Sequence, residues 1–174
     1  MRIALTNGHI VLPDRIITGQ ALVVEGETIL GLATADDLGS ETARLDVGGR
    51  LITPGLIDIH THGALGHSFN ERDPAAWTAI LQENARRGVT SLVATLAPEP
   101  IPDLVRCFEF CRRWMRAVRA DGCARVLGAH LESPYVSPAQ KGALDPAAMR
   151  TPDDGSVDAL LAHADALRIF VLAP

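Results

Sequence analysis

Two histidines separated by one residue are the strongest candidates for chemistry in this 174-residue sequence. His60 and His62 come directly after an apolar run at 56–59 that predicts a mostly buried strand. Residues i and i+2 of a strand share one face, about 6.6 Å apart along the chain, so both imidazoles can reach one metal ion beyond the strand end. An exposed loop would also hold two nearby histidines. The preceding strand and the glycine exit at Gly63 favour metal ligation.

A carboxylate supplies the second candidate. Glu132 follows a predicted strand at 124–131, and histidine plus carboxylate suits a divalent transition metal such as zinc or ferrous iron. A single glutamate after a strand is also often a solvated side chain. His130 shares the face of Glu132 and is either an orienting partner, a wall of the pocket or a core residue. His67 and His163 have no partner pattern and are interpreted as surface or loop residues.

The elements that must position these residues form two predicted parts. The first, residues 1–53, is predicted to be all-β, because short apolar runs alternate with turn residues at 3–5, 10–12, 21–24 and 28–32. Val24 to Thr28 predicts a tight hairpin, and the Thr53-Pro54-Gly55 turn predicts the domain boundary.

The second part, residues 54–174, alternates strands with helices. A parallel sheet covered by helices follows, because parallel strands need crossover connections. Both a doubly wound sheet and a (β/α) barrel satisfy this pattern, although no glycine-rich phosphate turn follows the first strand. In a barrel, His60 and His62 would lie at the catalytic end. The strands are predicted at 56–60, 89–95, 124–131 and 167–172, and the helices from Asp73-Pro74 to Gly88, from Leu104 to Val118 before Asp121-Gly122, and over 157–166.

Composition excludes several classes of protein. Hydrophobic residues make up 47% and charged residues 21% of the chain, which excludes a disordered protein. The net charge is −5 without a separate basic cluster, so no nucleic-acid partner is expected. No apolar run has the ~18–20 residues of a membrane span, and the N-terminus lacks signal-peptide features, so a cytoplasmic location is expected. The three cysteines lack CxxC spacing and are predicted to be buried small hydrophobes.

Two motifs carry a family resemblance. PGLIDIHTHG at 54–63 resembles the first-strand signature of the amidohydrolase superfamily. HLESPY at 130–135, Ser137-Pro138 and KGA at 141–143 form a narrower pattern. This pattern resembles the N-acetylglucosamine-6-phosphate deacetylase family within that superfamily. The resemblance extends over essentially all 174 residues.

The resemblance implies a fold, a site and a reaction. The fold would be an α/β (β/α)8 TIM barrel, here about four βα units, with a small N-terminal β-sandwich portion. Glu132 matches the metal-binding glutamate, His60 and His62 match a pair that supplies a second metal position in some members, and the backbone at Ala143 matches a sugar contact. One or two divalent metal ions and a homodimer are implied. The implied reaction hydrolyses the acetamide of an amino-sugar phosphate, with metal-activated water.

The resemblance also implies what lies outside this chain. The family's catalytic aspartate follows the eighth strand, so no catalytic residue is expected before residue 174. We therefore expect the chain to be inactive alone, as the N-terminal half of a longer enzyme or a partner of another half. Open sheet edges support that expectation.

Two departures from the family pattern bear on the site. Ser133 replaces the usual glycine, which predicts a backbone there that does not need a positive φ. Leu144 stands where the family often has histidine, which leaves the exact sugar open. Two alternatives also stay open: a non-catalytic half-barrel that binds metal or a partner, and another amidohydrolase of dihydroorotase-like or dipeptidase-like type.

Overall fold

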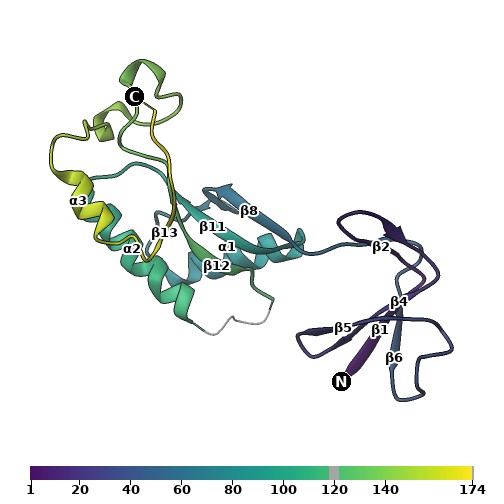
Figure 1. Cartoon of the computed structure of the whole chain (residues 1–174). Helices are drawn as coiled ribbons and strands as arrows, with labels where there is room; N and C mark the ends of the chain where they lie inside the picture. The colour runs from purple at the N-terminus through teal and green to yellow at the C-terminus, as the bar shows by residue number, and fades with distance from the viewer. Residues whose placement is uncertain (118–121, 174) are drawn as a thin grey trace. The chain divides into compact units, whose positions relative to one another are not determined.

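A computed structural model describes residues 1–117 and 122–173. The chain divides into two compact units, Met1–Pro54 and Gly55–Pro174 (Figure 1). In the described residues, every helix is too short or too polar to cross a membrane.

The first unit consists of β-strands, as predicted. One sheet has the order β5-β4-β1-β6 and the other the order β3-β2-β7. The predicted hairpin joins β4 to β5, with Glu25 opposite Thr28. Strand β6 was not predicted, because all four of its residues are exposed and its pattern is polar. The strands are β1 (Arg2–Thr6), β2 (His9–Val11), β3 (Ile16–Ile17), β4 (Ala21–Glu25), β5 (Thr28–Ala33), β6 (Ala43–Asp46) and β7 (Leu51–Ile52).

The second unit holds a four-stranded sheet in the order β13-β12-β11-β8. Every neighbouring pair in it is parallel, which confirms the prediction. The elements are β8 (Leu56–Thr61), β9 (Gly63–Ala64), β10 (His67–Ser68), α1 (Pro74–Arg86), β11 (Val89–Leu96), α2 (Ile101–Arg116), β12 (Arg125–Leu131), the 3-10 turns Pro138–Gln140 and Pro146–Ala148, α3 (Ser156–Leu161) and β13 (Leu167–Phe170). The predicted end of the second helix, Val118 and Asp121, lies outside the described residues.

Helix α1 forms where its capping residues predict it. The Asp73 carboxylate accepts a hydrogen bond from the Ala75 amide at 3.0 Å, and Pro74 occupies the first turn. Gly88 follows the helix with φ +88°, the left-handed conformation of a C-terminal cap. Trp77, buried in the α1 stripe, donates from Nε1 to the Glu71 carbonyl at 2.7 Å.

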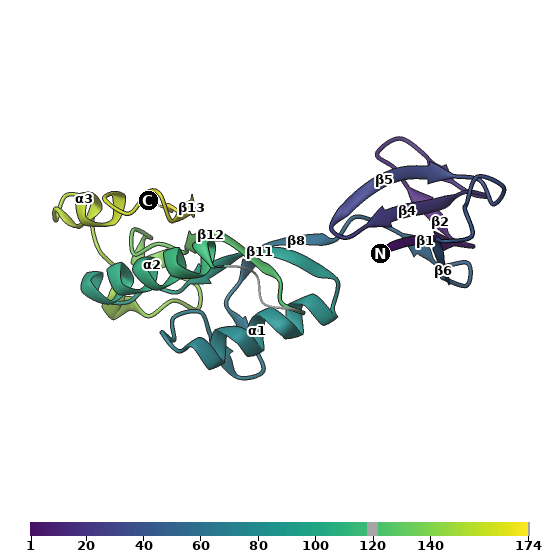
Figure 2. The same ribbon diagram turned by 90° about the horizontal axis from the view of Figure 1, so that it is seen from below.

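The core of this unit lies between the sheet and its helices (Figure 2). Alternate residues of β11, namely Leu92, Ala94 and Leu96, belong to that core together with side chains from α1 and α2. Residues between them in a strand point to the opposite face. Thr95 therefore lies on the face away from the helices, and its register partner His130 lies beside it. This opposite face carries the candidate site.

The prediction that 56–60 is mostly buried is wrong. Leu56, Ile57 and Ile59 are each more than half exposed. The physical reason is position, because among the described residues β8 pairs only with β11 and is an edge strand of its sheet.

The cysteine prediction is confirmed, since Cys107, Cys111 and Cys123 are all buried in the core. Burial raises the pKa of the Cys111 thiol to about 12. Cys107 also accepts a hydrogen bond from the Arg72 guanidinium at 3.3 Å. It is therefore more than a small hydrophobe.

Candidate metal centre

Three side chains from two separate strand ends converge on one point. The His60 Nε2 atom lies 3.4 Å from Glu132 Oε1, and the His62 Nε2 atom lies 2.9 Å from Glu132 Oε2. All three ligand atoms lie within 4.8 Å of one another. The Glu132 side chain is 24% exposed, whereas both imidazoles are about half exposed.

The donor set fits a divalent transition metal. Ligand atoms about 2.0–2.2 Å from a tetrahedral ion lie about 3.4 Å from one another, which matches the His60–Glu132 separation of 3.4 Å, whereas the His62–Glu132 separation of 2.9 Å is shorter. Two imidazole nitrogens and one carboxylate are ligands of the type that zinc and ferrous iron accept. Among residues 1–117 and 122–173, this is the only group of three that has such geometry.

The sheet brings the three residues together. Strands β8 and β12 lie on either side of β11. Because all three run parallel, their carboxyl ends meet at one edge. His60 and His62 come from the end of β8, and Glu132 is the residue after β12, where its amide donates to the Leu96 carbonyl at 3.1 Å.

The turn after His62 depends on glycine. Gly63 pairs with Ser68 in the short β9–β10 hairpin. A Cβ atom at Gly63 would lie 2.0 Å from the His67 carbonyl oxygen, so a larger residue cannot fit without a shift of the backbone. The Phe69 amide donates to the His62 carbonyl at 2.8 Å. The hairpin thus fixes the backbone of His62.

Two further side chains contact the backbone around His60. The Asp58 carboxylate accepts a hydrogen bond from the His60 amide at 2.9 Å. His130, which is 4% exposed, places Nδ1 2.8 Å from the Ile59 carbonyl oxygen and its ring centroid 4.6 Å from that of His60. Asp58 was missed from the sequence, although its place two residues before His60 is the spacing at which an aspartate bonds a nearby amide.

The expectation for Ser133 is wrong. Ser133 has φ +46°, the left-handed region that favours glycine. Its buried hydroxyl accepts a hydrogen bond from the Tyr135 amide. Serine therefore occupies the glycine-type conformation, with a local hydrogen bond that offsets part of the backbone cost.

The loop that carries Lys141 and Ala143 comes after β12 in the chain. Ala143 lies in an exposed turn between the two 3-10 turns. The Lys141 ammonium donates to the carbonyls of Gly142 and Leu144 at 3.2 and 3.0 Å. The Lys141 side chain therefore closes this turn through hydrogen bonds to its backbone.

The two remaining histidines of this unit do not join the three ligands. His67 lies 3.2 Å from Glu71 on the β10 side, half-exposed. His163 contacts the Arg112 guanidinium at 3.1 Å and stacks on Phe108 with a centroid distance of 6.0 Å. Each side chain thus has a partner away from the three candidate ligands.

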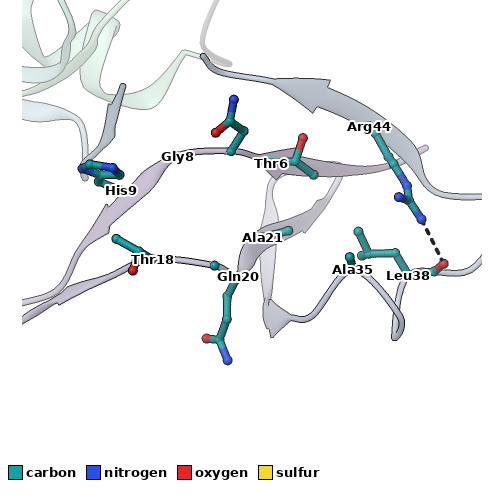
Figure 3. Close-up of a pocket in the computed structure, with 11 residues that line it drawn as sticks. Thr6, Gly8, His9, Thr18, Gln20, Ala21, Ala35, Leu38 and Arg44 are labelled. Carbon is teal, nitrogen blue, oxygen red and sulfur yellow. Dashed lines mark hydrogen bonds between the residues drawn. The ribbon is translucent and has the colours of Figure 1, made fainter. Parts of the chain in front are cut away.

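The first unit contains a separate hollow of about 380 Å³. Figure 3 shows its lining, which comes from residues 6–9, 18–21 and from Ala35, Leu38 and Arg44. Arg44 donates to the Leu38 carbonyl at 3.5 Å. Within the described ranges, the three-ligand group lies in the other unit, so this hollow is not a second candidate metal centre.

The amino-acid sequence is similar to those of several known enzymes. The chain is 26% identical over 174 residues to the N-acetylglucosamine-6-phosphate deacetylase of Haemophilus influenzae, covering 99% of this chain and 45% of that protein. It is 33% identical over 125 residues to the N-acetylgalactosamine-6-phosphate deacetylase of Escherichia coli O157:H7, covering 71% of this chain and 33% of that protein. The chain therefore spans less than half the length of these relatives.

A solved structure shows the same fold. The N-acetylglucosamine-6-phosphate deacetylase of Pasteurella multocida superposes with a TM-score of 0.89 over 99% of this chain and 45% of its own, at 24% identity. The α/β fold of TIM-barrel type is thereby confirmed, present here as three strand–helix units and a fourth strand. Residues 51–171 match the amidohydrolase family. This match includes His60, His62 and Glu132, and the chain belongs to the amidohydrolase family.

Proposed function

We propose that this protein is a metal-dependent deacetylase that hydrolyses N-acetylglucosamine 6-phosphate to glucosamine 6-phosphate and acetate. The observation that carries the proposal is the convergence of His60, His62 and Glu132 at the carboxyl edge of a parallel sheet. The names of the relatives from Haemophilus influenzae and Pasteurella multocida supply the substrate.

We assign metal binding to the three converging side chains. The donor set favours zinc or ferrous iron, as one or two ions per site. A divalent ion held there supplies Lewis acidity, which polarises an amide carbonyl and makes water a better nucleophile near neutral pH. Glu132 offers one oxygen toward each histidine, so it holds both imidazoles at the same point.

The substrate would lie over the loop after β12. In the family that the sequence resembles, the backbone at the position of Ala143 contacts the sugar. The internal hydrogen bonds of Lys141 give the turn a defined shape before any ligand binds. The acid/base aspartate of that family follows the eighth strand, so we assign no catalytic residue within 1–174.

We extend the proposal to the organisation of the chain. Residues 1–53 would form part of a β-sandwich, and residues 54–174 would form the first half of a barrel that carries the metal site. A homodimer and a cytoplasmic location belong to the same proposal.

One observation favours a second sugar. The relative from Escherichia coli O157:H7 is an N-acetylgalactosamine-6-phosphate deacetylase, and Leu144 stands where the resembled family often has a polar histidine. A lost hydrogen bond at a sugar hydroxyl can change selectivity by orders of magnitude. N-acetylgalactosamine 6-phosphate is therefore the alternative substrate.

The test is acetate release by the full-length protein whose reading frame contains this sequence. Both N-acetylhexosamine 6-phosphates are compared with N-acetylglucosamine that lacks phosphate. We expect acetate from a phosphorylated sugar and a loss of more than about 100-fold in Glu132→Gln, because a direct ligand matters at least as much as an outer partner.

Glu71→Gln is the matched control. Glu71 also faces a histidine, His67, but lies outside the three-ligand group. We expect this variant to keep its activity. The proposal fails if no acetate appears from either phosphorylated sugar, or if Glu132→Gln is as active as Glu71→Gln.

A further inference from the structure

Strand β8 contains an irregularity that includes the first candidate metal ligand, His60. Leu92 of β11 pairs with Asp58 of β8, and Ala94 of β11 pairs with Thr61 of β8. Between these two pairs the chain advances by two residues in β11 but by three in β8. One residue of β11 therefore faces two residues of β8, Ile59 and His60. This two-against-one arrangement is a β-bulge, which re-aims a side chain and leaves the extra residue outside the regular ladder.

Side chains bond the backbone groups at this bulge. The Asp58 carboxylate accepts from the His60 amide at 2.9 Å. His130 lies 2.8 Å from the Ile59 carbonyl. A carbonyl oxygen only accepts, so the proton of that bond is on Nδ1 of His130. Two side chains from two strands thus bond successive groups of one irregular segment.

His130 also touches a ligand directly. Its ring meets the His60 ring edge-on, with centroids 4.6 Å apart and an interplanar angle of 63°. The residue is buried, and its Nε2 atom has no partner among the described residues. A position that needed only core packing would be filled as well by leucine. Histidine offers what leucine lacks, namely an N–H donor for the Ile59 carbonyl and an aromatic ring that packs against the His60 ring.

We propose that Asp58 and His130 are positioning residues that hold the β8 bulge, and that the bulge aims His60 at the point shared with His62 and Glu132. Asp58 fixes the His60 amide from the same strand. His130 reaches past β11 from β12, so the direction of the His60 ring depends on the spacing between the two strands that supply the ligands. The inference rests on the metal centre proposed above.

The test is cobalt binding by the purified, metal-free full-length protein. Co²⁺ is titrated in while the visible absorption band of the bound ion is recorded, which reports both affinity and ligand geometry. The free energy of unfolding without metal is measured in parallel for every variant. A purely structural role would lower that free energy and leave the cobalt affinity and the band unchanged.

Two pairs of variants separate the hydrogen bond from the volume of the side chain. His130→Leu removes the donor, whereas His130→Asn retains an amide N–H near the place of Nδ1. Asp58→Ala removes the acceptor, whereas Asp58→Asn retains a carbonyl oxygen. Thr95→Val is the control, because Thr95 is a buried register neighbour of His130 whose hydroxyl has no partner in the described chain.

We expect His130→Leu and Asp58→Ala to bind Co²⁺ about 10–100-fold more weakly, as for other residues that orient metal ligands. The asparagine variants should recover most of that affinity and the native band, and Thr95→Val should match wild type. Native affinity and band in both His130→Leu and Asp58→Ala would overturn the inference while leaving the metal centre intact. A wild-type protein that binds no Co²⁺ would overturn the metal centre itself, and this inference with it.

Discussion

Ser133, which has a left-handed backbone and follows the proposed metal ligand Glu132, allows a direct test of what stabilises this loop. Ser133 follows Glu132, has φ +46° and is fully buried. Two opposing effects act at this residue. Its side chain makes the left-handed backbone costly, but its hydroxyl accepts a hydrogen bond from the amide of Tyr135, which is also buried.

The two effects are separated by Ser133→Gly and Ser133→Ala. Both variants leave the buried Tyr135 amide without its acceptor, at a cost of about 1–3 kcal/mol. Alanine also keeps the backbone strain, which costs about 1 kcal/mol or more at a non-glycine residue. Glycine removes that strain. We therefore expect Ser133→Ala to be less stable than wild type, and Ser133→Gly to be more stable than Ser133→Ala by about 1 kcal/mol.

Urea unfolding followed by tryptophan fluorescence measures both differences. A gap of about 1 kcal/mol corresponds to about 2–4 °C in Tm for a domain of 150–250 residues, so thermal unfolding provides a second reading. Equal stability of the two variants would contradict the strain. A Ser133→Ala protein as stable as wild type would refute the role of the hydroxyl.

Three further predictions concern the packing and charges of the second unit. Trp77 packs against Phe69 and Phe110 with centroid distances of 4.9 and 5.2 Å, so Trp77→Ala should cost about 3–5 kcal/mol in urea unfolding, and a loss below 1 kcal/mol would contradict the packing. The Arg112 guanidinium holds the pKa of Asp165 below its ordinary value, so this pair stabilises the fold above about pH 4, and its contribution is lost as the pH falls through the lowered pKa. In Asp165→Asn, the free energy of unfolding should therefore fall less on acidification than in wild type. Identical pH profiles of this free energy in the two proteins would contradict the contribution of the pair. Burial raises the pKa of the Cys111 thiol to about 12, so a thiol reagent at pH 8 should modify this residue only when the protein unfolds. Fast labelling of Cys111 in the native protein would contradict its burial.

Much of the fold could be predicted because its signals are local. Asp73 and Gly88 mark both ends of α1 through capping that involves only neighbouring residues. The alternation of β-branched strands with helices predicts the parallel sheet. By contrast, the exposure of β8 follows from its place at the edge of the sheet, which depends on which strands surround it and is not encoded in residues 56–61 themselves.

In the candidate site, too, some features could be predicted from the sequence and others depend on the fold. His60, His62 and Glu132 could be selected from residue type and from their places at strand ends. The β8 bulge around Asp58 could not, because the register shift between β8 and β11 depends on both strands and not on residues 56–61 alone. The φ of Ser133 was mispredicted, since the hydroxyl bond to the Tyr135 amide makes a glycine conformation available to serine.

The proposed function depends most on whether the three converging side chains bind a metal ion. The direct measurement is the metal content of the purified full-length protein after equilibration with zinc and dialysis, in wild type and in Glu132→Gln. We predict about one or two zinc ions per chain in wild type and a loss of at least one ion in the variant, because Glu132 faces both histidines. A wild-type protein without metal, or a Glu132→Gln protein with the same content as wild type, would contradict the assignment.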